Sequence, residues 1–431
     1  MMREAKSSGI AWIGTIPKCW ETDKLKYHLR RNEPRNPGDV VVLSLYRELG
    51  VIPKDSRDDN HNVTSEDTSK YKYVRPGDFV INKMKAWQGS VAVSEYEGIV
   101  SPAYFVYEFT DDTIFKRYFH YLLRSCYKDE FMRLSGGIRV GQWDLPADAL
   151  ENTPILIPPM DEQCRIADFL DAKCAEIDAL TADIQSQIDT LEQYKRSVIT
   201  ETVTKGLNPD AEMKDSGIDG AGVTPSHWKT TRLCYECYIR ARLGWRGLKA
   251  DEYVDEGYAF ISAFNIQNGK LVWTPLNYIT KERFDESPEI KLHSGDVLIV
   301  KDGAGVGKCA RVDDLPIGGT APNSSIAVIT PSKNLDYRYV CYYLQSAVFN
   351  NFVLLLYNGM GVPHLTQEVM SKIKILVPPL KEQMVISDYL DAKCTEIDAV
   401  VETKRSQLAT LDEYKKSLIF EYVTGKKGVK I

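Results

Sequence analysis

The 431-residue chain carries 54 basic and 60 acidic side chains, a formal net charge of −6, and 43% of its residues are hydrophobic. This composition is typical of a soluble globular protein, and the length exceeds one ordinary core, which predicts two domains with connecting elements. No run of about 18 apolar residues and no apolar leader segment occur, which argues against a membrane or secreted protein and predicts a cytoplasmic one whose nine cysteines are reduced. Most of the acidic excess lies in residues 151–208, so the other parts are near neutral and nucleic-acid binding is neither required nor excluded.

The first half of the chain predicts a mixed domain followed by a long helix. Residues 40–46 and 79–83 are typical of strands, and the Pro-Gly-Asp turn at residues 76–78 opens the second of them. Residues 112–134 predict a helix with one apolar side. The second half of the chain repeats this order of elements.

Two motifs occur twice. The opening Gly14-x-Ile16-Pro17-x-x-Trp20 returns as Gly222-x-Thr224-Pro225-x-x-Trp228, and Pro158-Pro159-x-x-Glu162-Gln163 returns as Pro378-Pro379-x-x-Glu382-Gln383. A repeat of this length indicates a duplicated domain pair with internal pseudo-twofold symmetry, which suits a target that itself has two halves. Because Trp20 and Trp228 recur, we expect them to pack the scaffold or an interface rather than to read sequence.

After each Pro-Pro pair the apolar period changes to seven, which predicts two long helices that pair as a coiled coil. The predicted seam residues are Leu170, Ile177, Leu180, Ile184 and Leu191 in the first helix and Leu390, Ile397, Val400, Leu411 and Leu418 in the second. Of the polar residues on one predicted row, Gln187 and Gln407 are expected to fix register, whereas Lys173 and Lys393 could do so or contact another subunit.

The connectivity favours antiparallel pairing of the two helices, because a parallel pair would force the second domain to run along their whole length. About 40 residues at ~1.5 Å each would make a rod of ~60 Å. Two domains held apart by such a rod suit DNA half-sites spaced about one helical turn, ~34 Å.

The predicted fold class is therefore α+β: two tandem mixed α/β domains, each followed by a long helix, the helices forming an antiparallel coiled coil with pseudo-twofold symmetry. The predicted boundaries are 1–155 and 208–375 for the globular domains and 156–207 and 376–431 for the helices.

The order of domains and helices, together with both repeated motifs, resembles the specificity subunit of Type I restriction-modification enzymes over essentially the whole chain. The resemblance implies two target-recognition domains, each reading one half of a split double-stranded DNA sequence, with the helices setting the spacer. It also implies that the helices dock two modification subunits, which bind S-adenosylmethionine and methylate adenine, and that restriction subunits using ATP and Mg²⁺ join this defence complex. The chain itself would be non-catalytic and without a cofactor. Thr224, which stands where the first copy has Ile16, is a mild departure.

Several strings that could indicate catalysis or metal binding fail on spacing, so no catalytic residue and no metal site are predicted. The run 303–308 resembles a phosphate loop, but Asp302 stands where a P-loop needs glycine and Cys309 where it needs Ser or Thr. Cys234 and Cys237 lack a second ligand pair at zinc spacing. A nuclease-like string at residues 209–214 lies in a linker, and no Asn-Pro-Pro-Tyr motif occurs.

Loops that combine basic, amide and aromatic residues are the candidate DNA contacts, since Lys neutralises phosphate, Gln and Asn pair with bases, and Trp stacks. The candidates are Lys83, Lys85, Trp87, Gln88, Arg139, Gln142 and Trp143 in the first half, and Arg240, Arg242, Arg246, Lys301, Lys308, Asn323 and His364 in the second. The mismatched regions 31–76 and 239–294 are also expected to differ in what they read.

Two alternatives stay open at this stage. A coiled-coil scaffold with duplicated protein-binding domains would use the same architecture, and steep salt dependence of duplex binding would separate it from a DNA reader. A standalone nuclease or methyltransferase would require activity from this chain alone.

Overall fold

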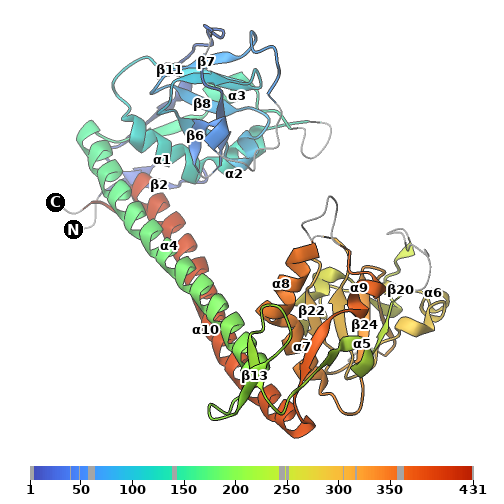
Figure 1. Ribbon diagram of the computed structural model, residues 1–431. Helices are drawn as coiled ribbons and strands as arrows, with labels where there is room; N and C mark the ends of the chain where they lie inside the picture. Colours follow the sequence, from blue (N-terminus) through green and yellow to red (C-terminus); the bar gives the residue numbers. More distant parts are fainter. Residues whose placement is uncertain are drawn as a thin grey trace. The chain divides into compact units, whose positions relative to one another are not determined.

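The computed structural model describes residues 4–38, 40–47, 49–56, 64–137, 143–241, 248, 252–303, 305–315, 318–356 and 364–429. The chain divides into two compact units (Figure 1), residues 1–184 with 406–431 and residues 185–405. Each unit therefore combines one globular domain with the start of one long helix and the end of the other.

Unit 1 is built around a four-stranded antiparallel sheet in the order β4-β11-β8-β9. Strand β8 (Phe79–Asn82) is buried along its whole length, as its continuous apolar run requires. The other elements are β1 (Ala5–Ser7), β2 (Thr15–Pro17), β3 (Glu21–Lys24), η1 (Leu25–Tyr27), β4 (Leu29–Arg31), β5 (Leu43–Tyr46), β6 (Gly50–Pro53), η2 (Lys54–Ser56), β7 (Lys72–Val74), η3 (Ala86–Gln88), β9 (Val91–Val93), β10 (Gly98–Val100), β11 (Tyr104–Phe109), α1 (Lys116–Cys126), α2 (Lys128–Leu134), α3 (Ala147–Glu151) and β12 (Pro154–Ile157).

The predicted helix over residues 112–134 is two helices, α1 and α2, which meet at Tyr127. The Tyr127 ring is fully buried and its hydroxyl donates to the carbonyl oxygen of Pro154 at 2.9 Å. This anchor explains the break, because it holds the ring in the core where the chain changes direction. The strand predicted over residues 40–46 is confirmed only for Leu43–Tyr46, since Val42 forms a single bridge to Ile99.

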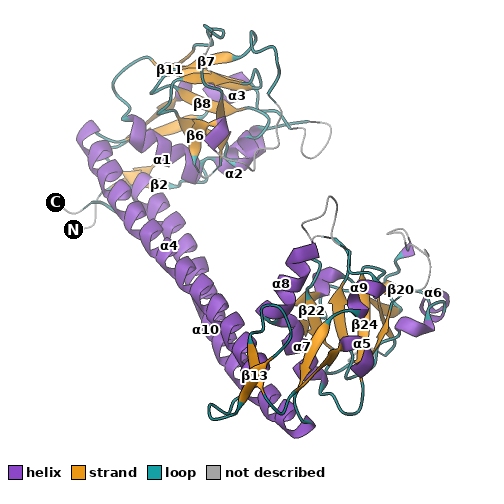
Figure 2. Cartoon of the chain, viewed as in Figure 1, coloured by secondary structure: helices purple, strands orange, loops and turns teal. Residues whose placement is uncertain are grey.

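Unit 2 repeats the plan, with helices beside its strands (Figure 2), and its four-stranded sheet has the order β16-β24-β21-β22. Unit 2 also has a three-stranded sheet, β20-β17-β23, in which β17 and β20 come from the region where the second half has about ten inserted residues, whereas β23 comes after β22. The elements are β13 (Met213–Asp215), β14 (Val223–Pro225), β15 (Lys229–Arg232), α5 (Leu233–Glu236), β16 (Cys237–Arg240), β17 (Tyr258–Ile261), η5 (Ala263–Asn265), β18 (Ile266–Gln267), β19 (Lys270–Leu271), β20 (Asn277–Ile279), α6 (Lys281–Asp285), η6 (Pro288–Ile290), β21 (Val297–Val300), β22 (Cys309–Arg311), β23 (Thr320–Pro322), β24 (Ile326–Pro331), α7 (Tyr337–Gln345), α8 (Ala347–Leu356), α9 (Gln367–Ser371) and β25 (Lys374–Val377).

The two long helices are α4 (Met160–Lys205) and α10 (Leu380–Val423), of 46 and 44 residues. In both units their contacts run in opposite sequence directions, which confirms the antiparallel pairing. The contacts that show it are Phe169 with Tyr422 and Asp178 with Lys415 in unit 1, and Glu192 with Arg405 and Lys195 with Asp398 in unit 2.

One of the two predicted rows of the helix seam is shielded from solvent. Its members, Leu170, Ile177, Ile184, Leu191, Leu390, Ile397, Leu411 and Leu418, are buried or half-buried. The prediction that Leu180 and Val400 lie in the seam is wrong, because these residues are 47% and 42% exposed. The second row of the seam lies four residues after the first rather than three, at positions such as Cys174, Ile188, Cys394 and Val401.

The polar residues expected in the seam lie outside its buried rows for the same reason. Gln187 and Gln407 are exposed, so neither lies in a buried row of the seam, but Gln187 accepts from Lys404 on the other long helix. Lys173 and Lys393 each pair with a glutamate three residues later on their own helix. The seam's own polar members are instead cations such as Lys195, which pairs with Asp398 on the other helix at 2.6 Å.

The repeated motifs meet in space in both units. The indole N–H of Trp20 donates to Glu162 at 2.9 Å, and that of Trp228 donates to Glu382 at 3.0 Å. Both tryptophans are buried, as a scaffold role predicts. The first turn of each long helix is thereby fastened to the opening of the domain that precedes it.

The glutamine of each Pro-Pro-x-x-Glu-Gln motif fixes the residue just before a helix of the same domain, α1 in unit 1 and α7 in unit 2. Gln163 accepts from the backbone N–H of Phe115 at 2.7 Å, and Gln383 accepts from that of Asp336 at 2.8 Å. Because an amide side chain both accepts and donates, it can replace a backbone partner for a loop that has none.

Each domain also binds the end of the other long helix. Tyr118 donates to the carbonyl oxygen of Val423 at 2.9 Å in unit 1, and Tyr339 donates to that of Val203 at 3.2 Å in unit 2. These carbonyls belong to the last turn of a helix, where no intrahelical donor is available. The hydroxyls therefore satisfy them in the core.

Candidate nucleic-acid interface

Lys83 and Lys301 occupy the same place in the two sheets. Each follows directly after a buried strand, β8 or β21, and each donates its backbone N–H to the residue before the neighbouring strand, at 3.3 and 2.7 Å. The carbonyl oxygen of Lys83 accepts from Leu145 at 3.0 Å, and that of Lys301 accepts from Leu365 at 2.9 Å. Two loops far apart in the sequence are thereby held together in each domain.

The side chains around these two lysines differ between the domains. Lys83 Nζ lies 2.8 Å from Asp144, whereas Lys301 Nζ lies 2.9 Å from Asp302. His364, which stands where the first domain has Asp144, pairs with Asp302. Burial lowers the pKa of Lys301. The same frame therefore presents different combinations of charge, which is what two readers of different sequences require.

In the first domain the two predicted loops come together. The Trp87 ring lies 5.6 Å from that of Trp143, at 64°, and its N–H donates to Met84 at 3.1 Å. Lys85 is exposed, and Gln88 is half-buried and accepts from Arg47 at 3.1 Å. Arg139 and Gln142 lie outside the described residues.

In the second domain Lys308 is exposed, and half of the His364 side chain is exposed. The Asn323 side-chain oxygen accepts from the N–H and hydroxyl of Ser325, at 3.1 and 2.7 Å, so it shapes the turn before β24. Arg242 and Arg246 lie outside the described residues.

Arg240 is the predicted contact that the structure places in the protein interior. Its side chain is 8% exposed, and its guanidinium donates to Asp296 at 2.5 Å and to the carbonyl oxygen of Lys291 at 2.7 Å. A buried ion pair with these hydrogen bonds holds the sheet to the following turn, so we correct the assignment of Arg240 to the interface. The sequence reasoning counted its charge without regard to its position in strand β16.

Sequence reasoning missed a cationic cluster in the first domain. Arg31 lies 4.4 Å from the centre of the Phe105 ring, and Lys72 and Lys83 lie 5.5 and 5.9 Å from it. Glu33 accepts from Arg31 and lies 2.9 Å from Lys72. Burial would raise the pKa of Glu33, but the bonds from these two cations outweigh it and lower the pKa. The mismatch between the repeats over residues 31–76 was the available signal.

No group of three or more His, Cys, Asp or Glu residues that could hold a metal ion occurs within the described ranges. Among the helices that the structure describes, none is long and apolar enough to cross a membrane.

Comparison with known proteins defines the class. The sequence profile of the Type I restriction modification DNA specificity domain matches residues 28–190 and again residues 244–409. The MjaVIII specificity subunit of Methanocaldococcus jannaschii is 25% identical over 424 residues, covering 96% of this chain and 94% of the relative. The EcoKI specificity subunit of Escherichia coli is 24% identical over 210 residues, covering 48% of this chain and 44% of the relative.

A solved structure from work on complex assembly and conformational transition of the type I R-M system shares the fold. Its TM-score is 0.69 at 18% identity, and the alignment covers 96% of this chain and 99% of that one. Two copies of one DNA specificity domain, each on the same sheet frame, define a protein that recognises DNA sequence. The chain belongs to the Type I restriction-modification specificity family, and it is a specificity subunit with two target-recognition domains.

Proposed function

We propose that the two domains each read one half of a bipartite DNA target, through the loops that follow β8 and β21. The equivalence of Lys83 and Lys301 carries this proposal. Their backbones are held in the same way, whereas their neighbours differ. Exposed Lys85 and Lys308 extend the same two loops with positive charge that can meet phosphate.

The long helices supply the partner surface in this proposal. Leu180 and Tyr194 on α4 are 47% and 49% exposed, and Val400 and Tyr414, at the matching positions of α10, are 42% and 54% exposed. Exposed apolar residues that recur at the same positions of a repeat suit two copies of one partner. We take these partners to be two modification subunits, joined by restriction subunits.

Chemistry is assigned to the partners rather than to this chain. S-adenosylmethionine would be bound by the modification subunits, and ATP and Mg²⁺ by the restriction subunits, all in the cytoplasm. The chain would then contribute recognition and assembly but no catalytic group. Methylation of DNA by the purified chain alone would contradict this.

The test of recognition is a map of methylated adenines made with the modification subunit and variants of this chain. We expect Trp87→Ala to relax only one half of a split motif, and Lys308→Ala to affect only the other. Lys18→Ala serves as a matched control, since Lys18 is an exposed lysine on the motif that opens the first domain. Uniform loss across both halves in either variant, or an equal effect of the control, would argue against domain-specific reading.

The helices are tested by length. Inserting one heptad into α4 and one into the matching position of α10 should change the spacer that the complex accepts while both half-sites stay the same. A change of half-site sequence with an unchanged spacer would exclude the helices as the spacer element.

A further inference from the structure

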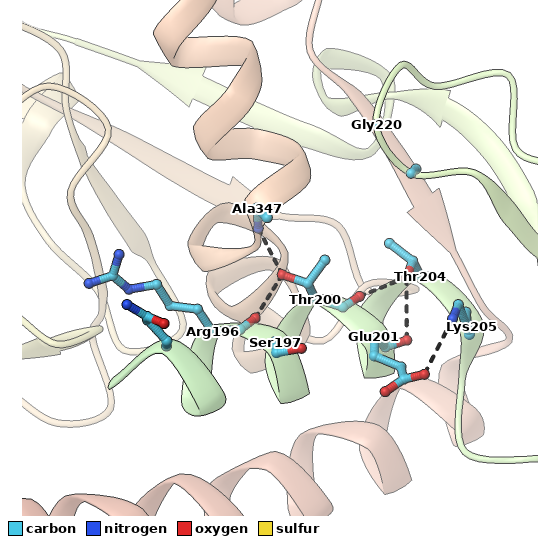
Figure 3. A pocket seen from close by; sticks show the side chains of 10 residues that line it. Arg196, Ser197, Thr200, Glu201, Thr204, Lys205, Gly220 and Ala347 are labelled. Carbon is cyan, nitrogen blue, oxygen red and sulfur yellow. Dashed lines mark hydrogen bonds and ion pairs between the residues drawn. The ribbon is translucent and has the colours of Figure 1, made fainter. Parts of the chain in front are cut away.

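Unit 2 carries an open pocket of about 550 Å³ beside the last turns of α4 (Figure 3). One face of that helix, the turn between β13 and β14, and the first residue of α8 surround it. The lining residues are Gln193, Arg196, Ser197, Thr200, Glu201, Thr204, Lys205, Gly220, Ala221 and Ala347.

The matching positions in unit 1 carry aromatic side chains. Alignment of the opening motifs matches Gly220 with Trp12, and alignment of the long helices matches Thr200 with Phe420. Trp12 and Phe420 both pack against the core of unit 1, and the Trp12 ring lies 5.8 Å from that of Tyr127 in an edge-on arrangement. Unit 2 therefore lacks an indole and a phenyl ring that unit 1 has.

The backbone that frames the pocket is the same in both units, so the missing rings have not been replaced by a collapsed turn. Ser8 accepts from the N–H of Ile10 at 3.0 Å, and Ser216 accepts from that of Ile218 at 3.2 Å. The backbone N–H of Ser8 donates to Gly14 at 2.8 Å, and that of Ser216 donates to its counterpart glycine at 3.0 Å.

A hydrogen bond keeps one wall of the pocket in place. Thr200 stands where unit 1 has a phenyl ring, and its hydroxyl accepts from the N–H of Ala347 at 2.8 Å, visible in Figure 3. The same hydroxyl donates to the carbonyl oxygen of Arg196 at 2.7 Å. The start of α8 is thereby tied to α4 beside the pocket.

The lining chemistry matches an aromatic ring with a polar edge. Methyl groups of Thr204, Ala221 and Ala347 offer apolar contact. The Arg196 side chain is 66% exposed at the rim, where a guanidinium can stack on a ring face. Glu201, paired with Lys205 at 3.3 Å, offers an acceptor for a ring N–H or hydroxyl.

We propose that this pocket binds a tryptophan side chain presented by a partner polypeptide of the complex. The inference rests on the proposed function for its partner, the modification subunit. Tyr194, which belongs to the exposed apolar row of the long helices, precedes the lining residues Ser197 and Glu201 by about one and two helical turns, so the same partner can reach both. Since the matching position in unit 1 carries Trp12, the two partner surfaces are unequal, and unit 2 binds its partner more tightly.

The pocket is tested on the full chain with N-acetyltryptophanamide as the probe and methyl NMR as the readout. We expect saturable shifts confined to the methyl groups of Thr200, Thr204, Ala221 and Ala347. Ser197→Trp fills the pocket from an exposed helix position and should weaken probe binding at least about tenfold, an effect of the size expected when an anchor pocket is lost. Ser417→Trp, at the matching position of α10, is the control and should leave binding unchanged.

The partner is tested by assembly with the modification subunit, measured by native mass spectrometry. Ser197→Trp should weaken one of the two binding steps, whereas Ser417→Trp should leave that step intact. Arg196→Met removes the rim cation without filling the pocket and should weaken probe binding in a chain that melts like the wild type.

Absence of saturable probe binding by the wild-type chain would overturn the pocket. Unchanged assembly of the Ser197→Trp variant would overturn the assignment to a partner polypeptide. Failure of DNA recognition would show instead in the methylation map, which the probe titration does not depend on.

Discussion

Replacing Trp20 with phenylalanine removes the N–H that donates to Glu162 at 2.9 Å while it keeps an aromatic ring in the core. A hydrogen bond to a charged group contributes about 1.5–3 kcal/mol. The space left by the smaller ring adds roughly 1 kcal/mol, because Trp20 is fully buried. We therefore expect Trp20→Phe to destabilise unit 1 by about 2.5–4 kcal/mol.

A double-mutant cycle isolates the hydrogen bond from the packing. Glu162→Met removes the acceptor while it keeps a side chain of similar length, so it should cost about 1–3 kcal/mol, because the buried Trp20 N–H then loses this partner. The cycle formed by the two changes should give a coupling of about 1.5–3 kcal/mol. Urea unfolding followed by hydrogen exchange in each unit supplies the four free energies of unfolding.

The second copy of the contact provides an internal comparison. The side chain of Glu382 is 28% exposed, whereas Glu162 is buried, so water can bond to Glu382 when the Trp228 N–H is removed. Its cycle should give a smaller coupling, roughly 1 kcal/mol. Equal couplings in the two units, or a value near zero in unit 1, would refute the argument that burial makes the first contact stronger.

Three further predictions concern single residues. Burial lowers the pKa of His120 to about 4, so the protein should be most stable above the unfolded pKa near 6.5 and should lose up to roughly 3 kcal/mol of stability as the pH falls to 4. His120→Gln should therefore make the melting temperature less dependent on pH over this range. An unchanged dependence on pH would contradict this prediction. Arg240→Met leaves its buried carboxylate partner, Asp296, unpaired and should lower the free energy of unfolding of unit 2 by about 3–5 kcal/mol, as measured with urea. Weaker DNA binding with unchanged stability would instead show that Arg240 belongs to the DNA interface. A Cβ at Gly425 would overlap the Pro17 ring, while a Cβ at Gly9 would meet no atom within 4 Å, and both glycines have positive φ. Gly425→Ala should therefore lower the melting temperature more than Gly9→Ala. Equal shifts in melting temperature would rule out the overlap.

The sequence predicted what is local or repeated. The duplication, the strand at residues 79–83 and the long helices follow from motif spacing and apolar period, and the structure confirms each. The pairing of Trp20 with Glu162 could not be predicted, because neither side chain carries a signal of its partner. The recurrence of both motifs indicated only that each of these residues has a role in both domains.

The wrong seam row has a physical cause. Rows spaced three and four residues from the first both fit a heptad, so side-chain polarity has to decide between them. The true row contains Lys195 and Thr202, and the exposed row contains Leu180 and Tyr194. The usual pattern places apolar residues in the seam and polar residues on the exposed rows. Here the seam contains a cross-helix ion pair, and the exposed row carries apolar groups that can contact a partner.

For the candidate interface, the sequence predicted Lys83 and Lys301 as the last residues of two strands, whereas the structure places each lysine directly after its strand, and the sequence could not weigh charge against burial. Arg240 has the same composition signal as its neighbours, and only the tertiary structure shows its carboxylate partner. The cluster around Phe105 joins residues from β4 and β7 with Lys83, so no window of sequence contains it. Contact of any of these residues with DNA stays a prediction.

The composition of unit 1 from residues 1–184 and 406–431 affects how the protein is made. Trp20 packs against Gly425, and Tyr118 needs the carbonyl oxygen of Val423, so the first of the two domains to be translated is completed by residues that are translated after the second domain. At a translation rate of roughly 5–20 residues per second, the apolar surface that the end of α10 covers stays exposed for tens of seconds. A chain that stops short of that helix end would expose a defect in its N-terminal domain, where chaperones and proteases can act before the second domain is ever used.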